Sequence, residues 1–377
     1  MPTKKKKQQS DFRYAVGDAR VPWHTVGERF DAKDITEVVK FLMPPSGDDN
    51  KAYTQSLREV GSALRQLGKQ SSLATKLSLG TQVAAAENEA KELLGVKHAC
   101  YLANWTGGME IAYKLSGLQP GDEVIVPSIT FIASVAYPLA VGAKLVFADV
   151  DPRTVNMDPA DVARKITKRT RVIMPVHIGG YPCDMTKIMK LAKEHDLFVI
   201  EDAAHGLGAM YKGKPLGTIG HFGGYSMHEV KNINSFGEGG LLVTNEPSGT
   251  QFSRGRFLGL DFTRTIENWL YDITPLEDRF GKPQVPGNYS ATEIAALGYR
   301  LQAKRLDKII AKRKKHADYL RDAFAKEKGI LLPPADTAKT YGSHHLFLLR
   351  IDPKRVGADI QALKRKLKEK GVTEVTH

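Results

Sequence analysis

The pattern of apolar and polar residues between positions 97 and 244 predicts strands that alternate with helices. The β-rich runs are short and are separated by helical stretches; they cover residues 99–102, 123–126, 144–148, 171–176, 197–200 and 241–243. Several runs are apolar almost throughout, as strands covered on both faces of a parallel sheet must be. The pattern therefore predicts an α/β domain with a mostly parallel sheet and crossover helices.

Helical spacing marks the segments on either side of this domain. Apolar residues at that spacing predict an entry helix within residues 30–43, capped by Asp34 and ended by the polar stretch 44–50. Residues 51–78 are polar and helix-favouring without a clear apolar stripe, which indicates a surface helix or an insertion. Beyond Pro286 the chain predicts a long helical segment over residues 292–325, a strand over 345–351 and a helix over 356–370. These last elements indicate a smaller α+β lobe.

Composition and charge exclude several classes of protein. The chain has 377 residues, of which 42% are hydrophobic, and can form one large core and a smaller one. Its two cysteines are too few for a disulfide framework, and no Cys or His spacing is typical of a metal site. No apolar run is long enough to span a bilayer or to act as an export signal, so we expect a cytoplasmic protein.

The formal net charge of +13 comes partly from lysine-rich runs at residues 4–7, 304–315 and 364–370. Such runs are typical of a mobile arm and of solvated helix faces, so nucleic-acid binding is not favoured. A basic balance does suit a substrate that carries phosphate.

Asp202 is the first residue with candidate chemistry, because it closely follows the apolar run 197–200. Ligands of an open α/β sheet bind at the carboxyl edge of its strands, where this residue is expected. An isolated aspartate at such a place is often a helix cap or a loop acid. An enzyme that uses pyridoxal phosphate (PLP), however, needs a carboxylate against the pyridine nitrogen, since the opposite charge keeps that ring protonated.

Lys231 is the second candidate. Most lysines are solvated, but glycines at 223–224 and 237–240 bracket this one and allow the backbone to approach a ligand. Ser226, five residues upstream, carries a hydroxyl that can bind a phosphate. A lysine amine can form a Schiff base with a cofactor aldehyde and afterwards shuttle a proton.

Two further candidates follow the first two predicted strands. Thr106 and Gly107 lie in a glycine-containing turn that begins a helix, and helix N-termini bind phosphate. A plain N-cap by Thr106 explains this turn equally well. Phe131 could stack on a cofactor ring, although an aromatic residue at this place is more often part of the core.

Together these stretches resemble the DegT/StrS family of sugar aminotransferases, a branch of the fold-type-I PLP enzymes. The most specific segments are PSITFIAS, FADVDPRT, PVHIGGYPCDM, VIEDAAHGLGA and the string from Ser226 through Lys231 to GEGG, in fixed order. The resemblance implies a mostly parallel large domain followed by a smaller α+β C-terminal domain. We accordingly expect a basic flexible arm at 1–20, a helical segment with room for an insertion at 21–75, a PLP-binding large domain at 76–260 and a small domain at 261–377.

The resemblance also implies roles for individual residues around the cofactor ring. Lys231 would hold the cofactor as a Schiff base, and Asp202 would bind the pyridine nitrogen. His205 would lie near the phenolic oxygen, and Phe131 would stack on the ring.

At the phosphate end, the resemblance implies that Thr106, Gly107 and Ser226 bind the cofactor phosphate. Asn288 matches an asparagine that reaches the phosphate of the neighbouring subunit, which implies a homodimer with shared active sites. The implied reaction moves an amino group from an amino acid, glutamate by resemblance, to a nucleotide- or phosphate-linked keto-sugar or to a cyclitol ketone.

Three departures from the family pattern bear on this interpretation. Ser290 stands where the family commonly has an arginine, so a charge is missing near the phosphate or substrate. Residues 256–261 lack a histidine-glycine pair that is often found there. The chain ends at His377, where relatives usually continue, so we expect the small domain to be incomplete at its C-terminal end.

Two other functions remain as alternatives. Some members of the family are sugar dehydratases, but these replace the lysine with histidine, and Lys231 argues against this activity. A non-catalytic PLP-binding regulator that contacts DNA is supported only by the basic balance and the lysine tail, and no helix-turn-helix signature precedes the large domain.

Overall fold

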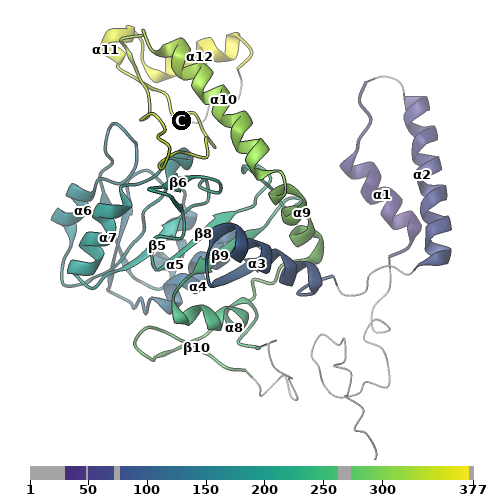
Figure 1. Ribbon diagram of the computed structural model, residues 1–377, viewed down its shortest axis with the longest axis horizontal. Coiled ribbons are helices and arrows are strands. Elements are labelled where there is room, and N and C mark those ends of the chain that lie inside the picture. The colour runs from purple at the N-terminus through teal and green to yellow at the C-terminus, as the bar shows by residue number, and fades with distance from the viewer. Residues whose placement is uncertain (1–29, 48–49, 72–76, 262–272, 373–377) are drawn as a thin grey trace, which may run out of the picture.

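A seven-stranded sheet covered by helices on both faces forms the body of the protein (Figure 1). The computed structural model describes residues 30–47, 50–71, 77–261 and 273–372, so the basic arm expected at 1–20 lies outside the described residues. The strand order is β1-β9-β8-β5-β4-β2-β3. The strands are β1 (His98–Leu102), β2 (Glu123–Pro127), β3 (Lys144–Ala148), β4 (Thr170–Ile173), β5 (Phe198–Asp202), β8 (Phe222–Ser226) and β9 (Gly240–Thr244).

Six of these seven strands run in the same direction. β8, β5, β4, β2 and β3 pair in parallel, whereas β9 is antiparallel to both of its neighbours, β1 and β8. This confirms the predicted α/β fold with a mostly parallel sheet. The one strand that the pattern did not predict is β8, whose sequence FGGYS contains two glycines that disfavour strands in isolation. As a result, the carboxyl ends of six strands meet at one edge.

Alternate residues of the strands bury two opposite faces of the sheet. Val124 and Val126 of β2 pack in one apolar core, whereas Ile125 between them packs in another. The first face is covered by α4 (Trp105–Leu115), α5 (Ala133–Ala140) and α8 (Phe252–Arg256). The second face is covered by α3 (Thr81–Leu94), α6 (Pro159–Lys165), α7 (Met185–Glu194) and α9 (Glu293–Ala303).

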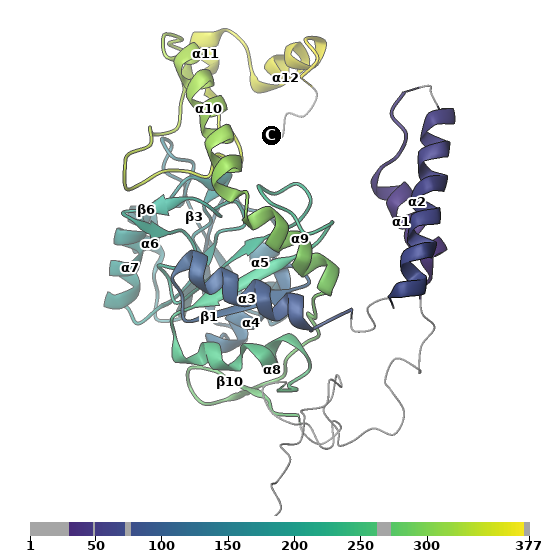
Figure 2. The same cartoon turned by 45° about the vertical axis from the view of Figure 1, so that its right-hand side comes forward.

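The C-terminal part rises from the sheet along one long helix (Figures 1 and 2). The helical segment predicted over 292–325 is in fact two helices, α9 and α10 (Leu306–Phe324), because residues 304–305 break the run. The strand predicted over 345–351 is wrong for most of its length: only β13 (Arg350–Ile351) is a strand, and it pairs with β12 (Ile330–Leu331). The helix predicted over 356–370 corresponds to α12 (Ile360–Glu369), and a separate short helix, α11 (Pro353–Val356), precedes it.

Two short hairpins lie outside the main sheet, namely β6 (Met210–Tyr211) with β7 (Lys214–Pro215) and β10 (Leu276–Glu277) with β11 (Pro283–Gln284). The expected domain boundary near residue 261 stays a prediction. Leu276 and Tyr299 lie beyond it in sequence, and both are fully buried in the two cores that flank the sheet.

The N-terminal helices α1 (Ala32–Leu42) and α2 (Asn50–Gln70) pack against each other and stand apart from the sheet in both views (Figures 1 and 2). The predicted entry helix is therefore present, and α2 is the surface helix that the polar stretch indicated. The cap of α1 is Asp31 rather than Asp34: the Asp31 carboxylate accepts from the Asp34 amide at 3.0 Å, and Asp34 bonds back to the Asp31 amide at 2.7 Å. Over the described ranges, no helix is long and apolar enough to cross a membrane.

Candidate active site

The carboxyl edge of the sheet brings together most of the predicted site residues. Asp202 is the last residue of β5 and pairs with Gly224 of β8, and Ser226 ends β8 two residues later. Lys231 lies in the turn that follows, with its backbone amide bonded to the carbonyl of His228 at 2.9 Å. Thr106 lies at the start of α4, directly after β1, at the same edge. Chain segments that are far apart in sequence thus converge because their strands are parallel.

The Asp202 carboxylate is buried and held by three donors. Its Oδ1 accepts hydrogen bonds from the Trp105 indole at 3.0 Å and from the Ala204 amide at 3.1 Å, and its Oδ2 accepts from the Ser134 hydroxyl at 2.7 Å. Backbone bonds tie Asp202 to the segment after β4, since its amide donates to the Pro175 carbonyl at 2.9 Å. The carboxylate therefore has a fixed orientation and is only 4% exposed.

Lys231 is half-buried, and desolvation lowers the pKa of its amine, while the negative charge of Asp202 partly opposes that shift. A lowered pKa increases the fraction of neutral amine, which is the nucleophilic form. Lys231 and Asp202 thus lie within electrostatic range of each other at the edge where both were predicted.

Two stacked histidines lie beside Lys231. The rings of His205 and His345 are 4.3 Å apart, centroid to centroid. Burial, and then the positive charges around them, lower the pKa of His205 to about 2 and that of His345 to about 3. The Gly179 amide donates to Nδ1 of His205 at 3.2 Å, which leaves the proton of the neutral ring on Nε2. His205 therefore presents an N–H donor rather than a charge.

Three residues of this region were not predicted from the sequence. His345 comes from the loop between β12 and β13, and its Nδ1 lies 3.0 Å from the Asn232 amide oxygen. The histidine doublet at 344–345 was a visible signal, but nothing in the sequence connects it to Lys231. Trp105 and Asn232 each adjoin a predicted residue, yet only the folded chain shows that Trp105 contacts Asp202.

The N-cap of α4 is a different residue from the one that the sequence suggested. Asn104, not Thr106, is the N-cap, and its side-chain oxygen accepts the Gly107 amide at 2.9 Å. Thr106 is an exposed residue of this helix end. A Cβ at Gly107 would come within 2.5 Å of the Tyr289 ring, so only glycine fits there.

Phe131 and Asn288 lie at the border of the site. The Phe131 side chain is 73% exposed after β2, so it is not part of the core. Asn288 lies in the turn before α9, where its side-chain oxygen accepts the Ser290 amide at 3.1 Å. The contact of Tyr289 with Gly107 brings this turn close to the start of α4 in the same chain.

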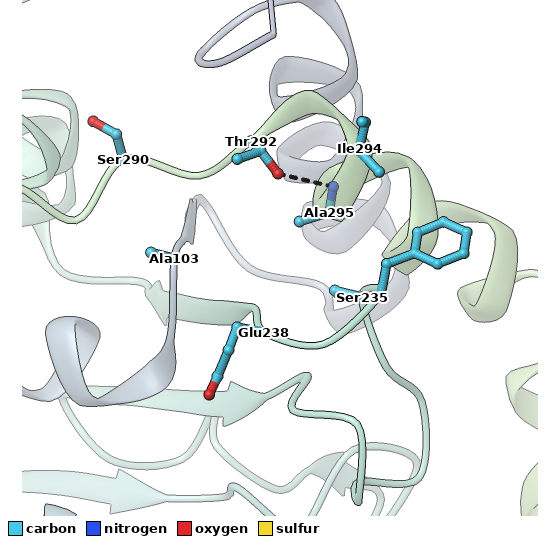
Figure 3. Close-up of a pocket in the computed structure, with 8 residues that line it drawn as sticks. Ala103, Ser235, Glu238, Ser290, Thr292, Ile294 and Ala295 are labelled. Carbon is cyan, nitrogen blue, oxygen red and sulfur yellow. Dashed lines mark hydrogen bonds between the residues drawn. The ribbon is translucent and has the colours of Figure 1, made fainter. Parts of the chain in front are cut away.

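A small hollow lies beside this turn (Figure 3). Figure 3 shows Ser290, Thr292 and Ile294 along the chain that enters α9, opposite Ser235 and Glu238 of the loop after Lys231. The Ser290 hydroxyl is buried and has no hydrogen-bond partner in the part of the chain that the structure describes. The hollow therefore adjoins both the Lys231 loop and the Asn288 turn.

Comparisons with protein families, with known proteins and with solved structures agree with one another. The sequence model of the DegT/DnrJ/EryC1/StrS aminotransferase family matches residues 62–377. The spore coat polysaccharide biosynthesis protein SpsC of Bacillus subtilis (strain 168) is 34% identical over 301 residues, which cover 78% of this chain and 74% of that protein. The GDP-perosamine synthase of Caulobacter vibrioides is 37% identical over 252 residues, which cover 66% of this chain and 63% of that protein.

Among solved structures, DesI in the presence of its TDP-sugar product is 30% identical, with a TM-score of 0.68. The similarity covers 81% of this chain and 72% of that chain.

Proposed function

This chain belongs to the DegT/DnrJ/EryC1/StrS aminotransferase family, and we propose that it transfers amino groups at the sheet edge that carries Lys231 and Asp202. It is a PLP-dependent sugar aminotransferase. The observation that carries the location is the juxtaposition of a desolvated amine with a buried, fixed carboxylate at the carboxyl ends of β5 and β8.

The chemistry of these donors fits PLP. The Lys231 amine can react with the aldehyde, the Asp202 carboxylate can pair with the pyridine nitrogen, and the neutral His205 ring can donate to the phenolic oxygen. Bound PLP supplies an aldehyde carbon that carries the amino group between substrates and a ring that stores an electron pair meanwhile.

In this proposal, each of three side chains has a separate role. Lys231 would hold the cofactor through its amine, and the neutral form of that amine would take and return the proton at the reacting carbon. Asp202 keeps the pyridine nitrogen protonated through its opposite charge. His205 orients the phenolic oxygen through Nε2, because Nδ1 is occupied by the Gly179 amide.

In this proposal, residues from other strands and helix starts bind the phosphate and cover the outer face of the ring. The phosphate would be bound by Thr106 and Gly107 at the start of α4 and by Ser226 at the end of β8, since the amide groups and dipole of a helix N-terminus stabilise a phosphate. Phe131, exposed at the same edge, is free of core packing and can cover the ring.

Names of relatives support the substrate class. We propose a keto-sugar linked to a nucleotide or phosphate as acceptor, since relatives include a GDP-perosamine synthase and a protein solved with a TDP-sugar product. The net charge of +13 favours such an anionic acceptor. Glutamate is the proposed donor, and the cytoplasm the proposed compartment, whose reducing conditions suit two free, buried cysteines.

The direct test uses the visible absorption of the cofactor. The purified protein loaded with PLP should show a visible band that glutamate removes, and Lys231→Ala should lack both this response and turnover. Lys187→Ala is the matched control, because the Lys187 side chain is 70% exposed, whereas Lys231 is half-buried. Turnover by Lys231→Ala would overturn the assignment.

We also propose that two copies form a dimer with shared sites. Large apolar side chains are exposed around the site and its bordering hollow: Phe131 (73%), Ile132 (62%), Val230 (61%), Phe236 (56%) and Ile294 (56%). Exposed apolar side chains gathered at one place are typical of a surface that another protein covers. In this proposal, Asn288 reaches across the two-fold axis to the cofactor phosphate of the partner.

Complementation distinguishes this arrangement from one within a single chain. Lys231→Ala and Asn288→Ala are mixed under conditions that exchange subunits. If Asn288 acts across the interface, each mixed dimer holds one intact site, and activity should exceed that of either variant alone. If it acts within its own chain, as the contact between Tyr289 and Gly107 would permit, no increase should occur and the shared site must be abandoned.

A further inference from the structure

The indole of Trp105 is wedged between two glycines below the candidate active site. Trp105 begins α4 and is only 2% exposed. A Cβ at Gly108 would come within 2.6 Å of the ring, and a Cβ at Gly224 of β8 would overlap it. Because both neighbours lack side chains, the ring fits in one plane and its N–H has a fixed direction. That N–H donates to Oδ1 of Asp202 at 3.0 Å.

The hydrogen bonds of Asp202 make its two oxygens unequal. Each carboxylate oxygen has two lone pairs, and Oδ1 uses both, for Trp105 and for the Ala204 amide. Among the described residues, Oδ2 accepts one bond, from Ser134. Oδ2 is thus the oxygen that still has a lone pair to offer.

Ser134 takes part in a chain of hydroxyl groups with a defined direction. Its only proton goes to Asp202, so the hydrogen bond of 2.8 Å between Thr130 and Ser134 must have Thr130 as the donor. The order Thr130, Ser134, Asp202 therefore leads from the surface of the site to the carboxylate.

We propose that Trp105 is a positioning residue that saturates Oδ1 of Asp202, so that Oδ2 is the oxygen presented to the pyridine nitrogen of the cofactor. This inference rests on the proposed role of Asp202. It gives the indole a role beyond packing, because the indole N–H donates directly to the carboxylate that is proposed to bind the cofactor.

The experiment compares the binding of two cofactors to the cofactor-free protein. One is PLP, and the other is its 1-deaza analogue, in which carbon replaces the pyridine nitrogen while the aldehyde and phosphate remain. Dissociation constants are measured by equilibrium dialysis for the wild type, Trp105→Phe and Asp202→Asn. The ratio of the two constants in each protein is an internal control, since general damage to packing weakens the binding of both cofactors alike.

We expect Trp105→Phe to reduce the preference for PLP over the analogue by about tenfold, the effect of losing one hydrogen bond to a charged group. Asp202→Asn should reduce it at least as much. If Asp202→Asn changes the preference and Trp105→Phe weakens both cofactors equally, Trp105 only packs and the inference is overturned. If Asp202→Asn leaves the preference unchanged, the proposed role of Asp202 itself fails.

Discussion

Replacement of Glu201 by glutamine tests how much the buried hydrogen bonds of the residue next to Asp202 stabilise the fold. Glu201 precedes Asp202 in β5, and its carboxylate is fully buried. Oε1 accepts from the amides of Ile219 and Gly220, both at 2.5 Å, and Oε2 accepts from the Gly217 amide and from Nε2 of His177, both at 3.0 Å. Every lone pair of the carboxylate is therefore in use.

Glutamine can satisfy only half of these donors. Its oxygen can keep two of them, but its NH2 group would face the other two. His177 cannot adapt by releasing its Nε2 proton to Nδ1, because the Cys183 amide already donates to Nδ1 at 3.1 Å. Two unsatisfied buried donors cost roughly 2–6 kcal/mol, and avoiding a buried charge offsets part of this, so we expect a loss of about 3 kcal/mol.

The assay is urea unfolding of the cofactor-free protein at one fixed concentration, followed by circular dichroism. Glu194→Gln is the matched control, because the Glu194 side chain is 50% exposed and its nearest charge, on Lys190, is 3.8 Å away. We expect the control to change the free energy of unfolding by less than about 0.5 kcal/mol. If Glu201→Gln is no more destabilising than Glu194→Gln, the bonding scheme described for Glu201 is wrong.

Three further predictions concern the site itself. Asp202→Asn should keep the fold but lose most of the transaminase rate, because an amide does not counter the pyridinium charge; near-normal turnover would show that another acid does so. The rate at which the cofactor-free protein binds PLP should rise with pH, with a midpoint below the pKa of an ordinary lysine, because burial lowers the pKa of Lys231. Stopped-flow absorbance measures this rate. A midpoint at or above the pKa of an ordinary lysine contradicts the prediction. Finally, the free energy of unfolding should fall as pH drops from about 6.5 toward 3. In the folded protein, His205 and His345 stay neutral over this range, because their pKa values are lowered to about 2 and about 3, whereas both histidines bind protons in the unfolded chain. A variant with both histidines changed to asparagine should show a smaller fall in urea titrations, and an equal fall would refute this.

Local patterns in the sequence determined which segments became strands and which residues followed them. Apolar runs bounded by turns predicted six of the seven strands, because a strand buried on both faces must be apolar along its length. Since parallel strands end at one edge, the position of Asp202 after the run 197–200 was enough to predict that it lies at this edge. Lys231 follows β8, which the pattern did not predict, so its place was inferred from the neighbouring glycines and from the family resemblance. Strand β8 was missed for a local reason as well: its two glycines have no side chains to favour an extended strand. Gly224 is explained only by the folded structure, where a Cβ would overlap the Trp105 indole and the Leu241 carbonyl.

Only the tertiary structure decided which other groups surround these residues. His345 stacks on His205, and Trp105 bonds to Asp202, through contacts between segments that no local pattern relates. The lowered pKa of Lys231 likewise follows from burial and from neighbouring charge, and both are properties of the packed site. The physical reason is that hydrophobic periodicity specifies the direction and burial of each element, whereas hydrogen bonds and desolvation depend on which elements pack together.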